Sequence, residues 1–207
     1  SAMTTQSNNT LIGRAAGQQA TFNNTVAIGS DALENTSGAQ NTAVGYRAGA
    51  VVTSGTNNVF LGYETGDANT TGLQNTFLGS LAGSDNITGA YNTFVGCVAG
   101  FGTTTGNYNV AIGDNTMYYT TTGSNNVALG RGALLKNTSN SNSTAVGMNA
   151  SWGTDSTAVT SVGFKANYAG SRTNANFAGS TAVGAYAGEH NSLTTGPVND
   201  TTYIGYF

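Results

Sequence analysis

The chain has 207 residues, of which 7% are charged and 30 are glycine, whereas globular domains average about 25% charged residues and about 7% glycine. A net charge of −3 leaves no basic surface for nucleic acid, and no apolar run approaches the roughly 18 residues of a membrane span, so we expect neither partner for this segment. The many Val, Thr, Tyr and Phe residues favour β-strands and argue against a disordered chain.

A short motif recurs along nearly the whole chain, as in Asn75–Gly79 and Asn92–Gly96. Most copies begin with Asn, continue with Thr or Val, then Ala or Phe, then an aliphatic residue, and all end with Gly. The twelve closing glycines are Gly13, Gly29, Gly45, Gly62, Gly79, Gly96, Gly113, Gly130, Gly147, Gly163, Gly184 and Gly205. Counted along the chain, the step between them is sixteen twice, seventeen six times, sixteen once and twenty-one twice. Self-similarity at a nearly fixed, short period is typical of a solenoid.

Each motif predicts one short strand of about five residues, because no helical stripe fits between the glycine turns. A second glycine turn follows ten positions after the motif glycine, as in Thr71-Gly72 and Thr88-Gly89. We therefore expect an all-β fold, a parallel β-solenoid of twelve coils whose period is mostly seventeen. Each coil should hold two extended segments and two turns, with successive strands about 4.8 Å apart.

Two adjacent apolar residues in each strand, such as Phe77 and Leu78, predict a chain that associates with copies of itself. Neighbouring side chains point to opposite faces of a strand, and a narrow coil has only one interior. The sequence does not decide which of the two faces the interior. We assign Phe60, Phe77 and Phe94 to packing within the coil or between chains. We assign the aliphatic row to the structural core: Ile12, Ile28, Val44, Leu61, Leu78, Val95, Ile112, Leu129, Val146, Val162, Val183 and Ile204.

The asparagine that heads most motifs has two possible roles. Stacked amides can form a hydrogen-bonded ladder along the axis, or the residue can serve the local turn geometry. The three phenylalanines share one register in consecutive coils, so we expect them to stack and the rod to be thicker there.

The pattern changes towards the C-terminus, where the period lengthens to twenty-one. We divide the chain into residues 1–3, which resemble the remainder of an expression tag, the regular repeats 4–163, and the longer coils 164–207. Terminal coils of solenoids are atypical because they cap the stack, although insertions often form binding loops. The aromatic residues gathered there are candidate ligand contacts, able to stack on sugar rings: Trp152, Tyr168, Tyr186 and Tyr206.

Catalytic and metal chemistry find no support in the sequence. His190 has only Glu189 and Asp200 as nearby acids, and Cys97 occupies a position that elsewhere holds varied polar residues, so we expect it to face solvent. We therefore predict no enzyme activity, no metal and no cofactor. Two threonine ladders leave ice binding as an alternative: Thr42, Thr76, Thr93 and Thr144, and Thr71, Thr88, Thr105 and Thr122. The first ladder is interrupted by Val26, Val59, Val110 and Val127.

Motifs such as Asn41–Ala48 and Asn126–Ala133 resemble the head repeats of YadA-like trimeric adhesins and related repeats of phage tail fibres and of trimeric fibres of predatory bacteria. The repeat here is longer than in YadA-like heads. The resemblance, over residues 9–207, implies a left-handed β-roll, a homotrimer around one axis, and an extracellular place on a cell or virion surface. It also implies an attachment role towards a surface glycan or protein receptor. The alternative is a monomeric solenoid that binds ice or a small ligand.

Overall fold

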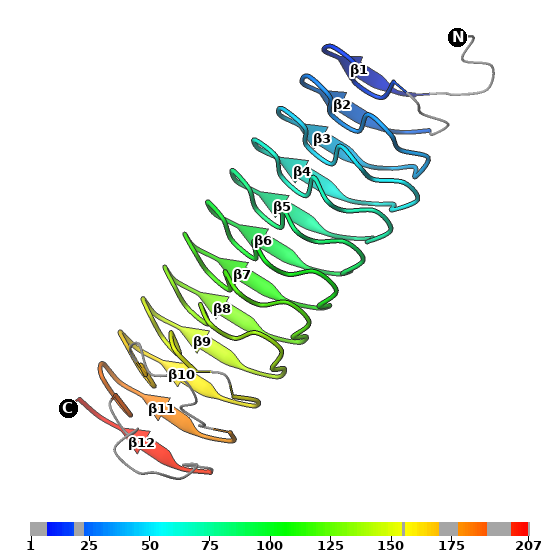
Figure 1. Cartoon of the computed structure of the whole chain (residues 1–207). Helices are drawn as coiled ribbons and strands as arrows, with labels where there is room; N and C mark the ends of the chain where they lie inside the picture. Colours follow the sequence, from blue (N-terminus) through cyan, green and yellow to red (C-terminus); the bar gives the residue numbers. More distant parts are fainter. Residues whose placement is uncertain (1–7, 19–22, 155, 170–177, 190–199, 207) are drawn as a thin grey trace.

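The chain forms a rod of stacked coils with its two termini at opposite ends (Figure 1). The computed structural model describes residues 8–18, 23–154, 156–169, 178–189 and 200–206. The expected tag remainder at residues 1–3 and His190 lie outside the described residues. Within the described part, the all-β prediction is confirmed.

Each of the twelve motifs forms one strand, and the strands make a single parallel sheet in sequence order. The register joins equivalent positions of successive repeats, so that Phe60 lies beside Phe77 and Phe77 beside Phe94. The strands are β1 (Thr10–Ile12), β2 (Val26–Ile28), β3 (Thr42–Val44), β4 (Val59–Leu61), β5 (Thr76–Leu78), β6 (Thr93–Val95), β7 (Val110–Ile112), β8 (Val127–Leu129), β9 (Thr144–Val146), β10 (Thr160–Val162), β11 (Thr181–Val183) and β12 (Thr202–Ile204).

The second extended segment expected in each coil does not form a strand in the part of the chain that the structure describes. Strands have three residues rather than five, and turns and bends make up the rest of each coil. The turns are nevertheless hydrogen-bonded from coil to coil. The amide of Thr53 donates to the carbonyl of Thr70 at 2.9 Å, and the amide of Gly66 donates to the carbonyl of Ala82 at 3.0 Å. Backbone groups in irregular segments therefore find partners in the next coil.

The central residue of each strand faces the coil interior, and its two neighbours face outwards. Phe60, Phe77 and Phe94 are fully buried, and the equivalent alanines fill the same row in most other coils. The aliphatic row lies on the outer face, where Leu61 is 42% exposed and Leu78 is 39% exposed. Our assignment of that row to the structural core is therefore wrong for the single chain. Adjacent side chains of a strand point to opposite faces, so only one of the two can lie inside the coil. In this structure the Ala or Phe lies inside.

Two positions in each coil share the interior space: the centre of the strand and the residue six positions later. Where the strand centre is Phe77, the residue six positions later is glycine, and a Cβ at Gly83 would lie 2.5 Å from the Phe77 ring. Where the centre is Ala, a larger residue can stand there, as in the buried pair Ala128 and Leu134. The rings of Phe77 and Phe94 are stacked with centroids 4.8 Å apart, whereas the Phe60 ring lies 5.6 Å from Phe77 with its plane tilted by 47°. They occupy space that glycine leaves, and a thicker rod at these coils stays a prediction.

An asparagine ladder runs along the inside of the rod from Asn41 to Ser143. The side-chain oxygen of Asn75 accepts the backbone amide of Asn92 at 2.9 Å, and its side-chain amide donates to the carbonyl of Gly89 at 2.8 Å. The backbone amide of Asn75 in turn donates to the side-chain oxygen of Asn58 at 2.9 Å. The ladder alternative is therefore the correct one, and it ties each coil to its neighbours through buried amides.

The corners of the coils are held in the left-handed backbone region. Twenty-six non-glycine residues of the described chain have positive φ, and they recur at equivalent positions, as at Gln74 (55°), Tyr91 (60°) and Tyr108 (57°). Even the β-branched Val98 adopts φ of 49°. Such residues are strained by about 1–2 kcal/mol each relative to the right-handed region. The hydrogen bonds between coils must offset this strain.

Replacing Asn75 with Ala should destabilise the rod by about 3 kcal/mol, because the buried amide of Asn92 and carbonyl of Gly89 would both lose a partner. Urea unfolding followed by circular dichroism measures the change. Thr71→Ala, which alters an exposed side chain at the second turn, is the matched control and should stay within about 0.5 kcal/mol of the wild type. Equal stability of the two variants would contradict the ladder.

A double variant tests whether the strand centre and the residue six positions later share one interior space. Phe77→Ala should cost about 3–5 kcal/mol through a cavity. Gly83→Leu should cost about 1–3 kcal/mol through overpacking and about 1–2 kcal/mol more because Gly83 has φ of 57°. Together they recreate the pairing of Ala128 with Leu134, so their combined cost should fall below the sum by about 1–3 kcal/mol. Additive costs in a denaturation cycle would show that the two positions do not share one space.

Candidate functional surfaces

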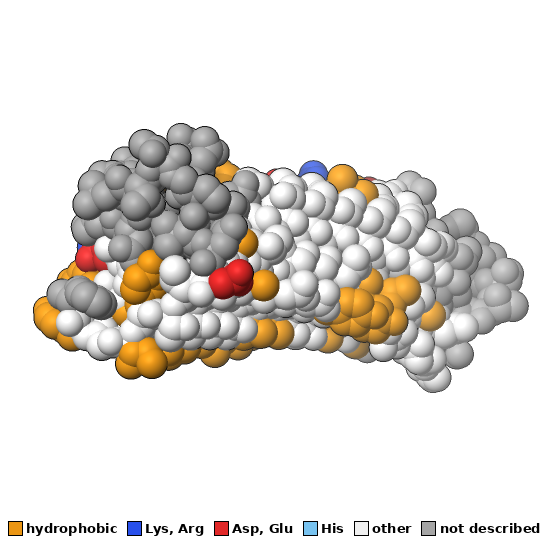
Figure 2. Space-filling model, turned by 90° about the horizontal axis from the view of Figure 1, so that it is seen from below, with side chains coloured by type: hydrophobic (Ala, Val, Ile, Leu, Met, Phe, Trp, Pro, Cys, Tyr) orange, Lys and Arg blue, Asp and Glu red, His pale blue; other side chains and the backbone are white. Residues whose placement is uncertain are grey.

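The strand face carries a row of apolar side chains along the described rod. The aliphatic row contributes one exposed or half-buried side chain from every strand, and the Thr or Val that begins most strands lies on the same side. Exposure rises to 76% at Ile204, in the last strand. On the face of the rod shown in Figure 2, hydrophobic side chains lie along the lower edge and charged side chains are few. A continuous apolar stripe of this length is typical of an interaction surface.

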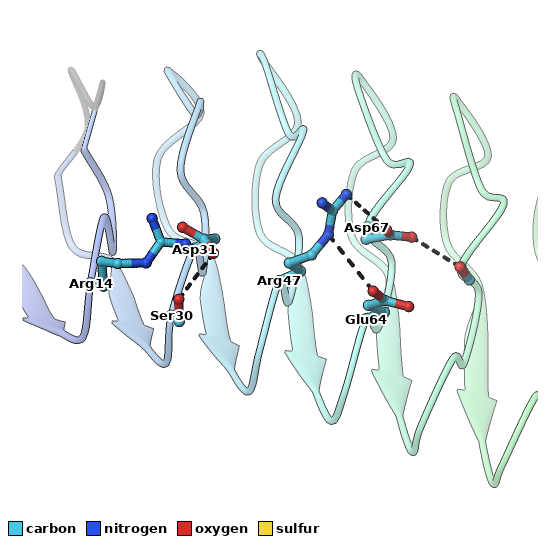
Figure 3. A network of polar contacts seen from close by, with 7 residues as sticks. Arg14, Ser30, Asp31, Arg47, Glu64 and Asp67 are labelled. Carbon is cyan, nitrogen blue, oxygen red and sulfur yellow. Dashed lines mark hydrogen bonds and ion pairs between the residues drawn. The ribbon is translucent and has the colours of Figure 1, made fainter.

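Most charged side chains are neutralised by partners in the adjacent coil. Arg14 pairs with Asp31, and Arg47 lies 3.9 Å from Glu64 and 3.4 Å from Asp67 (Figure 3). Exposed pairs of this kind contribute about 0–1 kcal/mol each. They join neighbouring coils of the rod.

The four aromatic residues predicted as ligand contacts come together in the structure. Trp152 packs against Tyr168 with centroids 5.4 Å apart, and Tyr186 packs against Tyr206 at 5.8 Å. Lys165 joins the two pairs, with its ammonium 5.0 Å from the Tyr168 centroid and 5.6 Å from that of Tyr186.

Three of these rings, those of Trp152, Tyr168 and Tyr186, already contact cations of the chain itself. The ammonium of Lys136 lies 4.6 Å from the Trp152 centroid, and Lys165 also lies 3.9 Å from a carboxylate oxygen of Glu189. Aromatic rings that already contact cations of the same chain agree with the interpretation that the longer coils cap the stack. Their role as sugar contacts remains a prediction, and the neighbouring segments 170–177 and 190–199 lie outside the described residues.

A groove in the middle of the rod was not predicted from the sequence. It has a volume of about 350 Å³ and its lining is mostly apolar. We call it the aromatic groove and define it by Asp85, Phe101, Gly102, Thr104, Tyr118, Tyr119 and Thr121. None of these residues lies in a strand. The sequence signal was a pair of aromatic residues five positions after successive motif glycines, Phe101 and Tyr118.

The aromatic side chains of the groove pack against one another. The rings of Phe101 and Tyr118 are stacked with centroids 5.0 Å apart and planes 10° apart, and Tyr119 meets Tyr118 edge-on at 4.7 Å. Gly102 takes the position that holds Asp85 in the preceding coil and Tyr119 in the following coil. The groove therefore lies where the middle of three equivalent residues has no side chain.

The polar side chains that line the groove can act as hydrogen-bond acceptors. Thr104 donates its hydroxyl to the carbonyl of Thr121 at 3.1 Å, and Thr121 donates its own to the carbonyl of Thr138 at 2.8 Å, so both oxygens keep lone pairs but no free proton. Asp85 is an exposed residue, but its carboxyl is partly covered, and this partial burial first and the carboxylate of Asp67 second raise the pKa of Asp85. No ion pair joins Asp85 to a cation among the residues described.

The two threonine ladders considered for ice binding differ in their setting. Thr42, Thr76, Thr93 and Thr144 lie on the outer strand face, mixed with valines. Thr71, Thr88, Thr105 and Thr122 are all exposed, but they lie at the second turn rather than on the sheet. A third column beside them uses its hydroxyls within the rod, as Thr53 and Thr70 donate to carbonyls of the next coil at 3.0 Å.

Within the described ranges, no group of three metal-ligating side chains occurs and no helix is long and apolar enough to cross a membrane. Cys97 is exposed, as predicted. The chain matches no protein-family model, no curated protein and no solved structure.

Asp85→Asn should stabilise the protein at pH 7, because ionised Asp85 is disfavoured by partial burial and by Asp67. The raised pKa means that folding favours the protonated acid, so the gain should shrink as pH falls through the pKa of Asp85. It should vanish about one unit below the ordinary Asp value of about 3.9. Urea midpoints of both proteins at neutral and at acid pH measure this, and equal midpoints at pH 7 would contradict it.

Proposed function

We propose that the chain is a structural and adhesive segment of a surface fibre, in which three copies associate through their strand faces. The observation that carries the proposal is the aliphatic row on the outer face of β1 to β12, exposed or half-buried in every strand. Burial of apolar surface contributes about 25 cal/mol per Å², so covering such a stripe is strongly favourable.

The best partner for this face is another copy of the chain. The row repeats once per strand along the rod, with successive strands about 4.8 Å apart. A surface that matches the stripe over its whole length needs the same repeat and the same length. A copy of the rod meets both conditions, as homo-oligomers commonly do through self-complementary or rotationally related surfaces.

The number of copies and the biological setting rest on the resemblance of the motifs to YadA-like and phage-fibre repeats. That resemblance supports a homotrimer, a left-handed β-roll and an extracellular location on a cell or virion. Attachment to a surface glycan or protein receptor would then gain strength from three copies acting together. A long rod that repeats one strand per coil suits a spacer or adhesive role.

The oligomeric state tests the proposal directly. The wild-type protein should sediment at about three times the chain mass of 20.8 kDa. Leu61→Lys combined with Leu78→Lys places two charges on the strand face and should give single chains, because buried unpaired charge is strongly unfavourable. Ile87→Lys, at an exposed apolar residue outside the strands, is the control and should remain a trimer. A wild-type mass of a single chain would overturn the proposal.

Ice binding by a single chain is the second candidate, supported by the exposed column Thr71, Thr88, Thr105 and Thr122. A thermal-hysteresis measurement separates it from the fibre. Clear activity of a monomeric protein, lost when Thr88 and Thr105 are changed to Lys, would favour this alternative over the adhesive segment.

A further inference from the structure

We propose that the aromatic groove binds a primary ammonium group, the side chain of a lysine presented by a partner protein. This goes beyond the fibre function and does not depend on it, because the groove belongs to one chain and none of its residues lies in a strand. Phe101, Tyr118 and Tyr119 supply the apolar walls, and Asp85 supplies the charge.

The chain contains a comparable site in which the cation is its own. Lys136 stands six positions after one motif glycine, and Trp152 stands five after the next. The amide of Lys136 donates to the Trp152 carbonyl at 3.2 Å, and its ammonium lies 4.6 Å from the Trp152 centroid. Gly102 and Tyr118 occupy the same two positions in the groove and make the same backbone bond, at 3.0 Å. The position that carries a lysine over an aromatic ring in one coil therefore carries no side chain in the groove.

The electrostatics of the groove favour a cation over a neutral or anionic ligand. Asp85 makes no ion pair within the described chain, and the charge that acts on it is the carboxylate of Asp67. Arg47 is already engaged with Asp67 and Glu64. A carboxylate whose charge is disfavoured in the free protein gains most from a cationic ligand, and aromatic rings attract cations further.

The hydrogen-bonding groups select a primary ammonium over a quaternary one. The oxygens of Thr104 and Thr121 have committed their protons to backbone carbonyls, so they can only accept, and ionised Asp85 can only accept. A primary ammonium offers three N–H donors to these acceptors, whereas a quaternary ammonium offers none. The mostly apolar lining suits the methylene stem of lysine, which packs on apolar surface while its head stays polar.

Titration of the full chain with Nα-acetyl-lysine amide, followed through the NMR resonances of the tyrosine rings, tests the proposal. We expect saturable shifts for Tyr118 and Tyr119 but none for Tyr63, which lies outside the groove. Nα-acetyl-norleucine amide, which lacks the charge, should not saturate. Trimethyl-lysine and glucosamine should bind more weakly than lysine. If trimethyl-lysine bound more tightly than lysine, the preference for a primary ammonium would be wrong. If glucosamine bound more tightly than lysine, the assignment of the ammonium to a lysine side chain would be wrong.

Three variants locate the site. Asp85→Asn should weaken binding about tenfold, the size of a lost charge-assisted hydrogen bond, while the fold is expected to be at least as stable. Tyr119→Ala should weaken it several-fold. Gly102→Lys should abolish it by supplying an internal ammonium. If Gly102→Lys does not fold, the first two variants decide the matter.

Matched controls lie outside the groove. Asp114→Asn removes an exposed acid that pairs with Arg131, and Tyr108→Ala removes an exposed ring that stacks on Tyr91. Neither should change the affinity for lysine. Unchanged binding in Asp85→Asn, or equal losses in the controls and the groove variants, would overturn the proposal.

Discussion

Hydrogen bonding between successive coils is the constraint on which the rest of this structure depends. A single coil has one strand of three residues and several corners in the left-handed backbone region, so it has few stabilising interactions of its own. Stability comes from the next coil, through the sheet, the bonds between turns and the buried asparagine ladder. Asn75 illustrates this dependence, since one side chain holds the following asparagine and a turn glycine together. The near-constant repeat follows from this requirement, because a ladder needs equivalent atoms at equal heights.

Closure of the coil decides which apolar residues remain available for a partner. The interior is narrow, and it accepts one side chain from each strand together with the residues of the opposite turn. Phenylalanine enters where glycine leaves room, and elsewhere alanine can be opposed by a larger residue such as Leu134. The larger aliphatic residues are consequently directed outwards along the whole sheet. The same packing rule that makes the rod narrow therefore produces the apolar face on which we base self-association.

Much of the fold could be predicted because the same motif recurs along the chain. Twelve copies of one motif give the strands, the parallel sheet and its register, and the adjacent pair Phe77 and Leu78 shows that both strand faces are apolar. Which of these two side chains faces the interior was not predictable from the strand alone. It depends on Gly83, six positions after Phe77 and across the coil. The second strand was over-predicted, since glycine turns and extended segments share the same residue types. The aromatic groove was missed because its residues come from three coils, and its defining feature is the absence of a side chain at Gly102.

The left-handed corners have a consequence for how the protein folds. An isolated coil would hold strained residues such as Val98 and Tyr91 without the bonds that compensate for them, so it should not persist alone. A coil placed on a formed neighbour gains those bonds immediately. Folding should therefore start from a rare nucleus of stacked coils and then advance along the axis one coil at a time, with each finished coil acting as the template for the next. The ends of the growing rod, and not its middle, are then where folding stops and where unfolding begins.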